Sequence, residues 1–77
     1  MQIAQAIGRI LEEALGVDPE TVDDTFAMGT PDLWDSATHI NIMLILERDF
    51  GVAIDEDTIV KATSYAGLAD IVGGAAA

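Results

Sequence analysis

Hydrophobic residues recur at intervals of three and four along this chain, a spacing that builds helices and leaves little scope for β-strands. From Gln2 to Leu15 this spacing gives one apolar face, made of Ile3, Ile7, Ile10, Leu11 and Ala14. The same spacing predicts a second helix from Ser36 to Asp49. Gly16 and Gly51 stand just past the ends of these two segments, where glycine stops a helix.

Two shorter helices are expected in the last third of the chain. One covers Glu56–Ala62, and the other follows Thr63 or Ser64, either of which can cap it, and continues to about Val72. The glycine and alanine residues at 73–77 predict a flexible tail. A chain of 77 residues forms one domain, so residues 1–77 are expected to be a single unit, ordered over about 2–72. The predicted fold class is all-α, a small four-helix bundle with a short third helix.

The connection between the first two helices, residues 17–34, is long but is not a disordered linker. Pro19, Gly29 and Pro31 interrupt regular structure, and residues 19–22 have the composition of a single helical turn. The loop also contains apolar side chains that would be unfavourable in water. We expect five of them to pin it across the open side of the helices: Val22, Phe26, Met28, Leu33 and Trp34.

Acidic residues dominate the charge of the chain. Fourteen aspartates and glutamates face only Arg9, Arg48 and Lys61, for a formal net charge of −11. Nucleic acid and anionic membranes are therefore not expected as partners, because binding them requires basic residues. Proteins with basic patches suit this charge, although it can also serve solubility alone.

Cysteine is absent, so the chain has no disulfide, no thiolate zinc site and no thiol nucleophile of its own. A single histidine, His39, rules out multi-histidine metal sites. No apolar run is long enough to span a bilayer, and the N-terminal residues lack the basic region of a signal peptide. A cytoplasmic protein without a metal is expected.

The helix predicted at 36–49 has two unlike faces. One is assigned to the core and holds His39, Ile42, Met43, Leu46 and Phe50. The opposite face holds Ala37, Ile40, Asn41, Leu44 and Arg48, with Glu47 at its edge. Ile40 and Leu44 stand one turn apart in line with Ser36, which predicts a docking patch for a partner protein. Alternatively, the long loop or the third helix covers this pair.

Ser36 follows Asp35 at the start of the second helix. The first turn of a helix offers unpaired N–H groups and the positive end of the dipole, which favour an anion such as a phosphoester. Aspartate and serine are also ordinary N-cap residues, so one of the two can cap the helix and leave the other free. By itself the pair is weak evidence of a site.

The order of the segments, however, resembles acyl carrier proteins and the related peptidyl carrier domains over about residues 3–72. The matching segments are Leu15–Asp18, Phe26, Asp35–Ser36, Glu47–Val52 with Ile54, and Asp55–Asp57 followed by Lys61 and Thr63. The resemblance implies that Ser36 carries 4′-phosphopantetheine, attached from coenzyme A by a phosphopantetheinyl transferase that Asp35 assists in placing its metal ion. The arm would hold an acyl or aminoacyl group as a thioester.

By this resemblance the chain is not an enzyme but a monomeric carrier. It would deliver its cargo to acyl-loading and acyl-processing enzymes in fatty-acid, polyketide or related biosynthesis. The chain departs from the family pattern at Ala37, where a larger apolar residue is usual, and in the run Gly29–Trp34 before the Asp-Ser pair. Thr38, Asn41 and Arg48 replace acids of the fatty-acid type. These differences indicate a specialised carrier with dedicated partners.

Rival interpretations of the same residues are weaker. Ser36 and His39 are close enough on a helix to form a hydrolytic dyad, but no strand–turn–helix nucleophile elbow surrounds the serine. The acidic clusters at 18–24 and 55–57 do not follow the EF-hand pattern. The alternative that remains is an acidic helical protein-interaction module without a prosthetic group.

Overall fold

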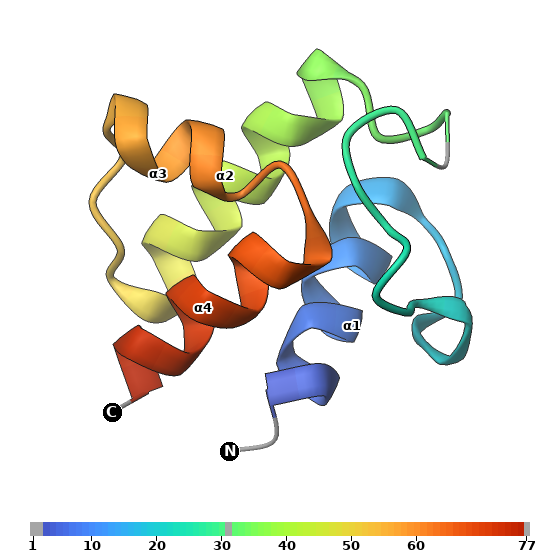
Figure 1. Cartoon of the computed structure of the whole chain (residues 1–77), viewed down its shortest axis with the longest axis horizontal. Coiled ribbons are helices and arrows are strands. Elements are labelled where there is room, and N and C mark those ends of the chain that lie inside the picture. Colours follow the sequence, from blue (N-terminus) through green and yellow to red (C-terminus); the bar gives the residue numbers. More distant parts are fainter. Residues whose placement is uncertain (1–2, 31, 77) are drawn as a thin grey trace.

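The computed structural model describes residues 3–30 and 32–76, and this part of the chain is helical apart from its connections (Figure 1). Its elements are α1 (Ile3–Leu15), the single 3-10 turn η1 (Pro19–Thr21), α2 (Ser36–Phe50), α3 (Glu56–Lys61) and α4 (Tyr65–Ala76). The predicted all-α bundle of four helices, with a long first connection and a short third helix, is confirmed. None of the described helices combines the length and the apolar character needed to cross a membrane.

The helix ends follow from side-chain caps. Asp55 accepts a hydrogen bond from the Thr58 N–H and caps α3. Ser64 is the residue that caps α4, because its Oγ accepts the Gly67 N–H at 3.1 Å. Gly51 ends α2 in the left-handed conformation with φ 65°, which residues with a side chain rarely adopt.

The last helix is longer than its sequence predicts. We expected α4 to end near Val72, yet it continues to Ala76, so residues 73–76 of the predicted flexible tail are helical. The reason is tertiary packing, since a Cβ on Gly73 would lie 3.3 Å from Cδ1 of Ile3 at the start of α1. Packing against α1 overrides the weak helix propensity of the two glycines. The expected start of α1 at Gln2 and the final residue Ala77 lie outside the described residues.

The core lies where α1 packs against both α2 and α4 (Figure 1). Its fully buried side chains are Ile7, Leu11, Trp34, Ile42, Leu46, Leu68 and Val72. The inward face predicted for α2 is buried as expected at His39, Ile42, Met43 and Leu46, while Phe50 is half-buried. Ile45, whose side the sequence did not settle, also joins the core.

The long loop is fastened to the start of α4 by its backbone. The Met28 N–H donates to the Thr63 carbonyl at 2.7 Å, and the Tyr65 N–H donates to the Phe26 carbonyl at 2.8 Å. Trp34 is fully buried and Val22 and Phe26 are half-buried, as expected of pinning residues. The expectation is wrong for Met28 and Leu33, which remain 40% and 56% exposed. Backbone hydrogen bonds, not these two side chains, hold that part of the loop.

Gly67 marks the closest approach between α3 and α4. A Cβ at this position would collide with the carbonyl of Lys61, a backbone group that cannot turn aside. Gly74 in the same helix has no atom within 4 Å of such a Cβ. Alanine at Gly67 therefore tests a packing requirement, whereas alanine at Gly74 tests helix propensity.

We predict opposite effects of alanine at these two glycines. Gly67→Ala should lower the free energy of unfolding by about 3 kcal/mol or more, because the backbone must separate. Gly74→Ala should leave it unchanged or raise it by up to about 1 kcal/mol, since alanine favours a helix. Urea denaturation followed by circular dichroism measures both. Equal stability of the two variants would show that α4 does not approach Lys61 as described.

Candidate functional site

Ser36 is the first residue of α2 and lies exposed on the surface. Among the described residues its Oγ takes part in no hydrogen bond, so the hydroxyl is free for chemistry. The preceding residues hold it there, since Trp34 is buried and Asp35 is the N-cap of the helix. A hydroxyl displayed in this way is accessible to a modifying enzyme.

Asp35, not Ser36, caps α2. Its Oδ1 accepts the Thr38 N–H at 3.0 Å, and Thr38 Oγ in return accepts the Asp35 N–H at 2.9 Å, which completes a capping box. The Thr38 hydroxyl also lies 2.8 Å from the carbonyl oxygen of Leu33, to which it donates. Asp35 therefore serves as the cap, and Ser36 is left free.

The Asp35 carboxylate is itself an anion at the positive end of the α2 dipole. The hydrogen bond from the Thr38 N–H holds the pKa of Asp35 below its ordinary value. Unpaired N–H groups for a bound phosphate are accordingly fewer than the sequence suggests, because Asp35 occupies the Thr38 N–H. Asp35 Oδ2 makes no hydrogen bond within the described residues, so one carboxylate oxygen remains available to a cation.

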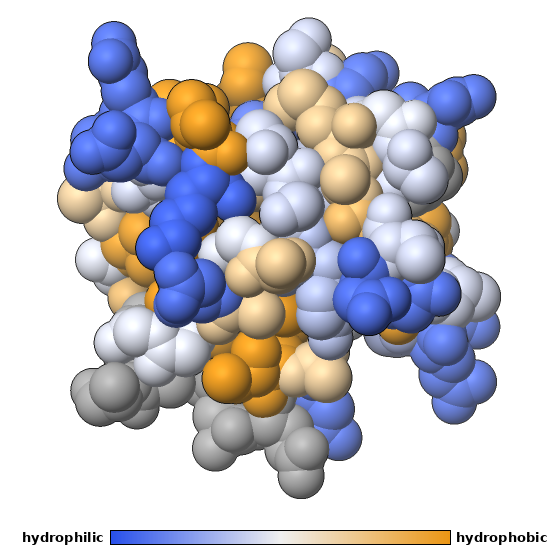
Figure 2. Space-filling model, viewed as in Figure 1, coloured by the Kyte–Doolittle hydropathy of each residue, from blue (hydrophilic) through white to orange (hydrophobic). Residues whose placement is uncertain are grey.

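The predicted docking residues form what we call the outer patch of α2: Ala37, Ile40, Asn41, Leu44, Glu47 and Arg48. All are exposed, and Ile40 and Leu44 expose 61% and 54% of their surface. Neither the long loop nor α3 covers this apolar pair, so the alternative that it belongs to the core is wrong. Figure 2 shows further hydrophobic atoms on the surface over α3, whose exposed side chains include Ile59 and Val60.

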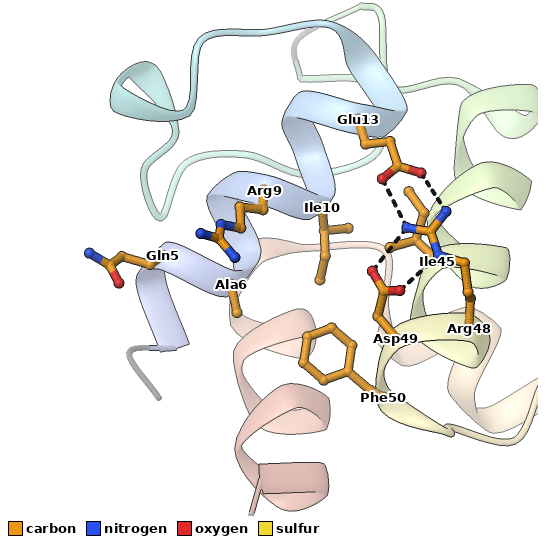
Figure 3. A pocket seen from close by; sticks show the side chains of 9 residues that line it. All are labelled: Gln5, Ala6, Arg9, Ile10, Glu13, Ile45, Arg48, Asp49 and Phe50. Atoms are coloured by element: carbon orange, nitrogen blue, oxygen red, sulfur yellow. Dashed lines mark hydrogen bonds and ion pairs between the residues drawn. The ribbon is translucent and has the colours of Figure 1, made fainter.

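Arg48 at the end of the outer patch is engaged by two carboxylates (Figure 3). Its Nη1 and Nη2 donate to the Glu13 carboxylate of α1 at 3.0 and 2.9 Å, and its Nε donates to Asp49 at 2.7 Å. These contacts lower the pKa of both carboxyls and raise that of the guanidinium. Arg48 therefore ties α2 to α1 and does not present a free positive charge.

An open groove of about 630 Å³ lies between α1 and the C-terminal half of α2, at the opposite end of α2 from Ser36. Figure 3 shows Ile10 and Phe50 facing each other across it, with the Glu13–Arg48–Asp49 cluster along one side. The remaining lining residues are Gln5, Ala6, Arg9 and Ile45. The groove is separate from the Ser36 end, and no residue of the Ser36 turn lines it.

His39 cannot serve Ser36 as a base. The imidazole is only 4% exposed, and both of its nitrogens are occupied. Nδ1 accepts the Trp34 Nε1–H at 3.1 Å, and Nε2 lies 2.9 Å from the carbonyl oxygen of Ile59 in α3. Sequence reasoning placed His39 inward but missed both partners, because Ile59 is twenty positions away in the chain.

Within residues 3–30 and 32–76, no three histidine, aspartate or glutamate side chains come close enough to hold a metal ion. Asp35 contributes at most a single carboxylate oxygen from this chain. Any cation used at Ser36 would need further ligands from a second molecule.

Ile40 and Ile42 make a matched pair for testing the two faces of α2. Ile42→Ala should lower the free energy of unfolding by about 2–5 kcal/mol, because that side chain is fully buried. Ile40→Ala should change it by about 0.5 kcal/mol or less, since most of its surface already meets water. Chemical denaturation of both variants provides the measurement. A large loss for Ile40→Ala would remove the outer patch from consideration as a binding surface.

No protein-family model, no curated protein and no solved structure matches the chain. Its function must therefore be inferred from its own residues: a free serine hydroxyl at a capped helix start, an exposed apolar pair beside it, and a strongly acidic surface.

Proposed function

We propose that this protein is a carrier whose chemistry takes place on a group attached to Ser36. The observation that supports this most is the free, exposed Ser36 hydroxyl, placed at the first position of α2 by the Asp35 cap. The resemblance of the segment order to acyl carrier proteins favours 4′-phosphopantetheine as that group. The departures from that pattern favour a specialised member with its own partner enzymes.

The residues present fit such a group. Ser36 is exposed and its Oγ has no competing hydrogen bond within the described residues, and the positive end of α2 tolerates a phosphodiester. Asp35 keeps one carboxylate oxygen for the cation that a transferase would bring. When attached, the arm would supply the thiol that this cysteine-free chain lacks, and an acyl group would be held on it as a thioester.

The attachment reaction requires no catalytic group of this chain. A bond forms between Ser36 Oγ and the phosphorus of coenzyme A that carries pantetheine, and the pyrophosphate bond to the adenosine bisphosphate breaks. The proton of the hydroxyl passes to a base of the transferase, because His39 is buried and fully hydrogen-bonded. In this proposal the protein is a substrate of the transferase.

The outer patch supplies the surface that partner enzymes would contact. Ile40 and Leu44 lie one and two turns from Ser36 along α2, so an enzyme that reaches the serine can also bury them. The net charge of −11 would steer partners with basic surfaces toward the molecule. Only Glu47 places an unpaired acid in the patch, so the contact itself would be largely apolar.

An acidic interaction module without a prosthetic group is the second candidate, and the exposed apolar pair favours it equally. The two proposals differ in the chemistry of Ser36. A pure interaction module has no use for a free hydroxyl at the head of its binding surface. Modification of the serine therefore decides between them.

We predict that incubation with coenzyme A, Mg²⁺ and a phosphopantetheinyl transferase of broad specificity adds one phosphopantetheine group. Intact-mass spectrometry measures the product. Ser36→Ala should abolish the addition while circular dichroism remains that of a folded helical protein. Ser64→Ala is the matched control, because the chain has only these two serines and Ser64 caps α4 at another place in the fold.

Two outcomes would contradict the proposal. Absence of any addition to the wild-type protein would leave the interaction module as the better candidate. Addition to the Ser36→Ala protein would show that the attachment site is elsewhere. Mass analysis of protein isolated from its native cell would, in addition, identify any acyl cargo.

A second prediction concerns the outer patch. Leu44→Glu should lower kcat/KM for modification of Ser36 by about tenfold, the loss typical of a buried interface residue. The melting temperature should change little, because Leu44 is 54% exposed. Thr21→Glu, a substitution on the exposed turn η1, adds the same charge and serves as the control. Equal rates for both variants would show that partners do not contact this patch.

A further inference from the structure

The Trp34–His39–Ile59 bridge is the feature of the interior that the proposed function does not use. It consists of the hydrogen bond from Trp34 Nε1 to His39 Nδ1 at 3.1 Å and that between His39 Nε2 and the Ile59 carbonyl at 2.9 Å. Trp34 is fully buried, and His39 is the buried polar side chain of the described core. The planes of the two rings are inclined by 28°, with centroids 6.2 Å apart.

The donors and acceptors of the bridge fix its chemical state. An indole N–H can only donate, so Nδ1 of His39 must accept and carry no proton. A carbonyl oxygen can only accept, so Nε2 must donate to Ile59. His39 is therefore held as the Nε2–H tautomer, and the bridge runs in one direction from Trp34 through His39 to Ile59.

The bridge joins three separate parts of the chain. Trp34 directly precedes the Asp35–Ser36 turn, His39 lies in the first turn and a half of α2, and Ile59 belongs to α3. The Ile59 carbonyl is in the last turn of α3, where carbonyls lack a partner within the helix. His39 satisfies it, so the side chain works as a C-terminal cap for a neighbouring helix.

Burial of its own side chains contributes little to holding α3 in place. None of its own residues is buried, and Ile59 and Val60 are 39% and 70% exposed. The ion pair of Lys61 with Asp70 lies on the surface, where such pairs contribute little. Besides the close packing of Gly67 in α4 against Lys61, the buried anchors of α3 are Ala62, just past its end, and the hydrogen bond from His39.

We propose that the Trp34–His39–Ile59 bridge couples the Ser36 turn to α3, with Trp34 and His39 as positioning residues. It sets the distance between the serine and the exposed apolar side chains of α3, so that an enzyme in contact with α3 finds Ser36 at a fixed place. The coupling is a property of the fold. Its consequence for modification rests on the proposed function.

Substitutions of His39 test the coupling. His39→Leu removes both hydrogen bonds, whereas His39→Gln retains an acceptor for Trp34 and a donor for Ile59 on one planar amide. Trp34→Phe removes only the first bond, keeps an aromatic ring, and is the milder variant should His39→Leu unfold. Circular dichroism establishes that each variant is folded before further measurement.

Amide hydrogen exchange distinguishes a specific effect on α3 from a general loss of stability. In His39→Leu, the amides of Ile59 in α3 and of Ala62 just past its end should exchange about two- to tenfold faster than in the wild type, after correction for any change at α1 amides such as Leu11. His39→Gln should restore slow exchange, and Trp34→Phe should lie between. An equal acceleration at all amides in both His39→Leu and Trp34→Phe would overturn the proposal, because the bridge would then contribute only to global stability.

Kinetics of Ser36 modification give the second readout. In folded His39→Leu, KM for the carrier should rise about two- to tenfold with kcat nearly unchanged, since α3 is less well placed for docking while the serine chemistry remains. His39→Gln should restore KM. Unchanged KM alongside faster α3 exchange would refute the role in positioning. If the wild-type protein is not modified at all, the proposed function fails, while the exchange measurement still decides the coupling.

Discussion

The burial of the Trp34 indole is the constraint on which the arrangement around Ser36 depends. A chain of 77 residues has a thin core, and Trp34 is the largest of its fully buried side chains. Burying an indole also requires an acceptor for its N–H, which His39 supplies at 3.1 Å. Because Trp34 stands two positions before Ser36, the chain must leave the interior at Asp35. The serine consequently emerges at the surface as the first residue of α2.

Helix α2 is divided between interior and surface along its whole length, and this division gives it two roles. His39 and Ile40 are neighbours in the chain, yet the first is 4% and the second 61% exposed. The inward residues hold α1, α3 and α4 in place, and the outward ones leave an apolar strip beside the serine. A substitution on the exposed face can therefore leave the stability unchanged, while one at the neighbouring buried position lowers it severely. This separation lets a small domain expose an apolar strip without weakening its core.

Local sequence signals were sufficient for the helices and insufficient for the contacts between them. Asp35, Gly51 and Ser64 act within one turn of their own position, so caps and stops could be predicted. The bond from His39 to Ile59 spans twenty positions and depends on how α3 packs, which no periodicity encodes. The same reason explains the length of α4, which stays helical where Gly73 lies close to Ile3 of α1. The exposed serine was predictable, whereas the hydrogen bond that joins α2 to α3 was not.

The negative charge belongs to the molecule as a whole, whereas the outer patch of α2 contributes little of it. Of the three basic residues, Arg48 is paired with Glu13 and Asp49, and Lys61 with Asp70. For the proposed carrier, the net charge of −11 would act as a field of the whole molecule that draws basic partners from a distance. The outer patch adds little to that field, because Arg48 is neutralised there and Glu47 is its one acid. For the proposed carrier, a partner arrives through electrostatics but is recognised through Ile40 and Leu44. Shape and apolar contact, not a row of ion pairs, would then distinguish its own enzymes from those that bind acidic helices.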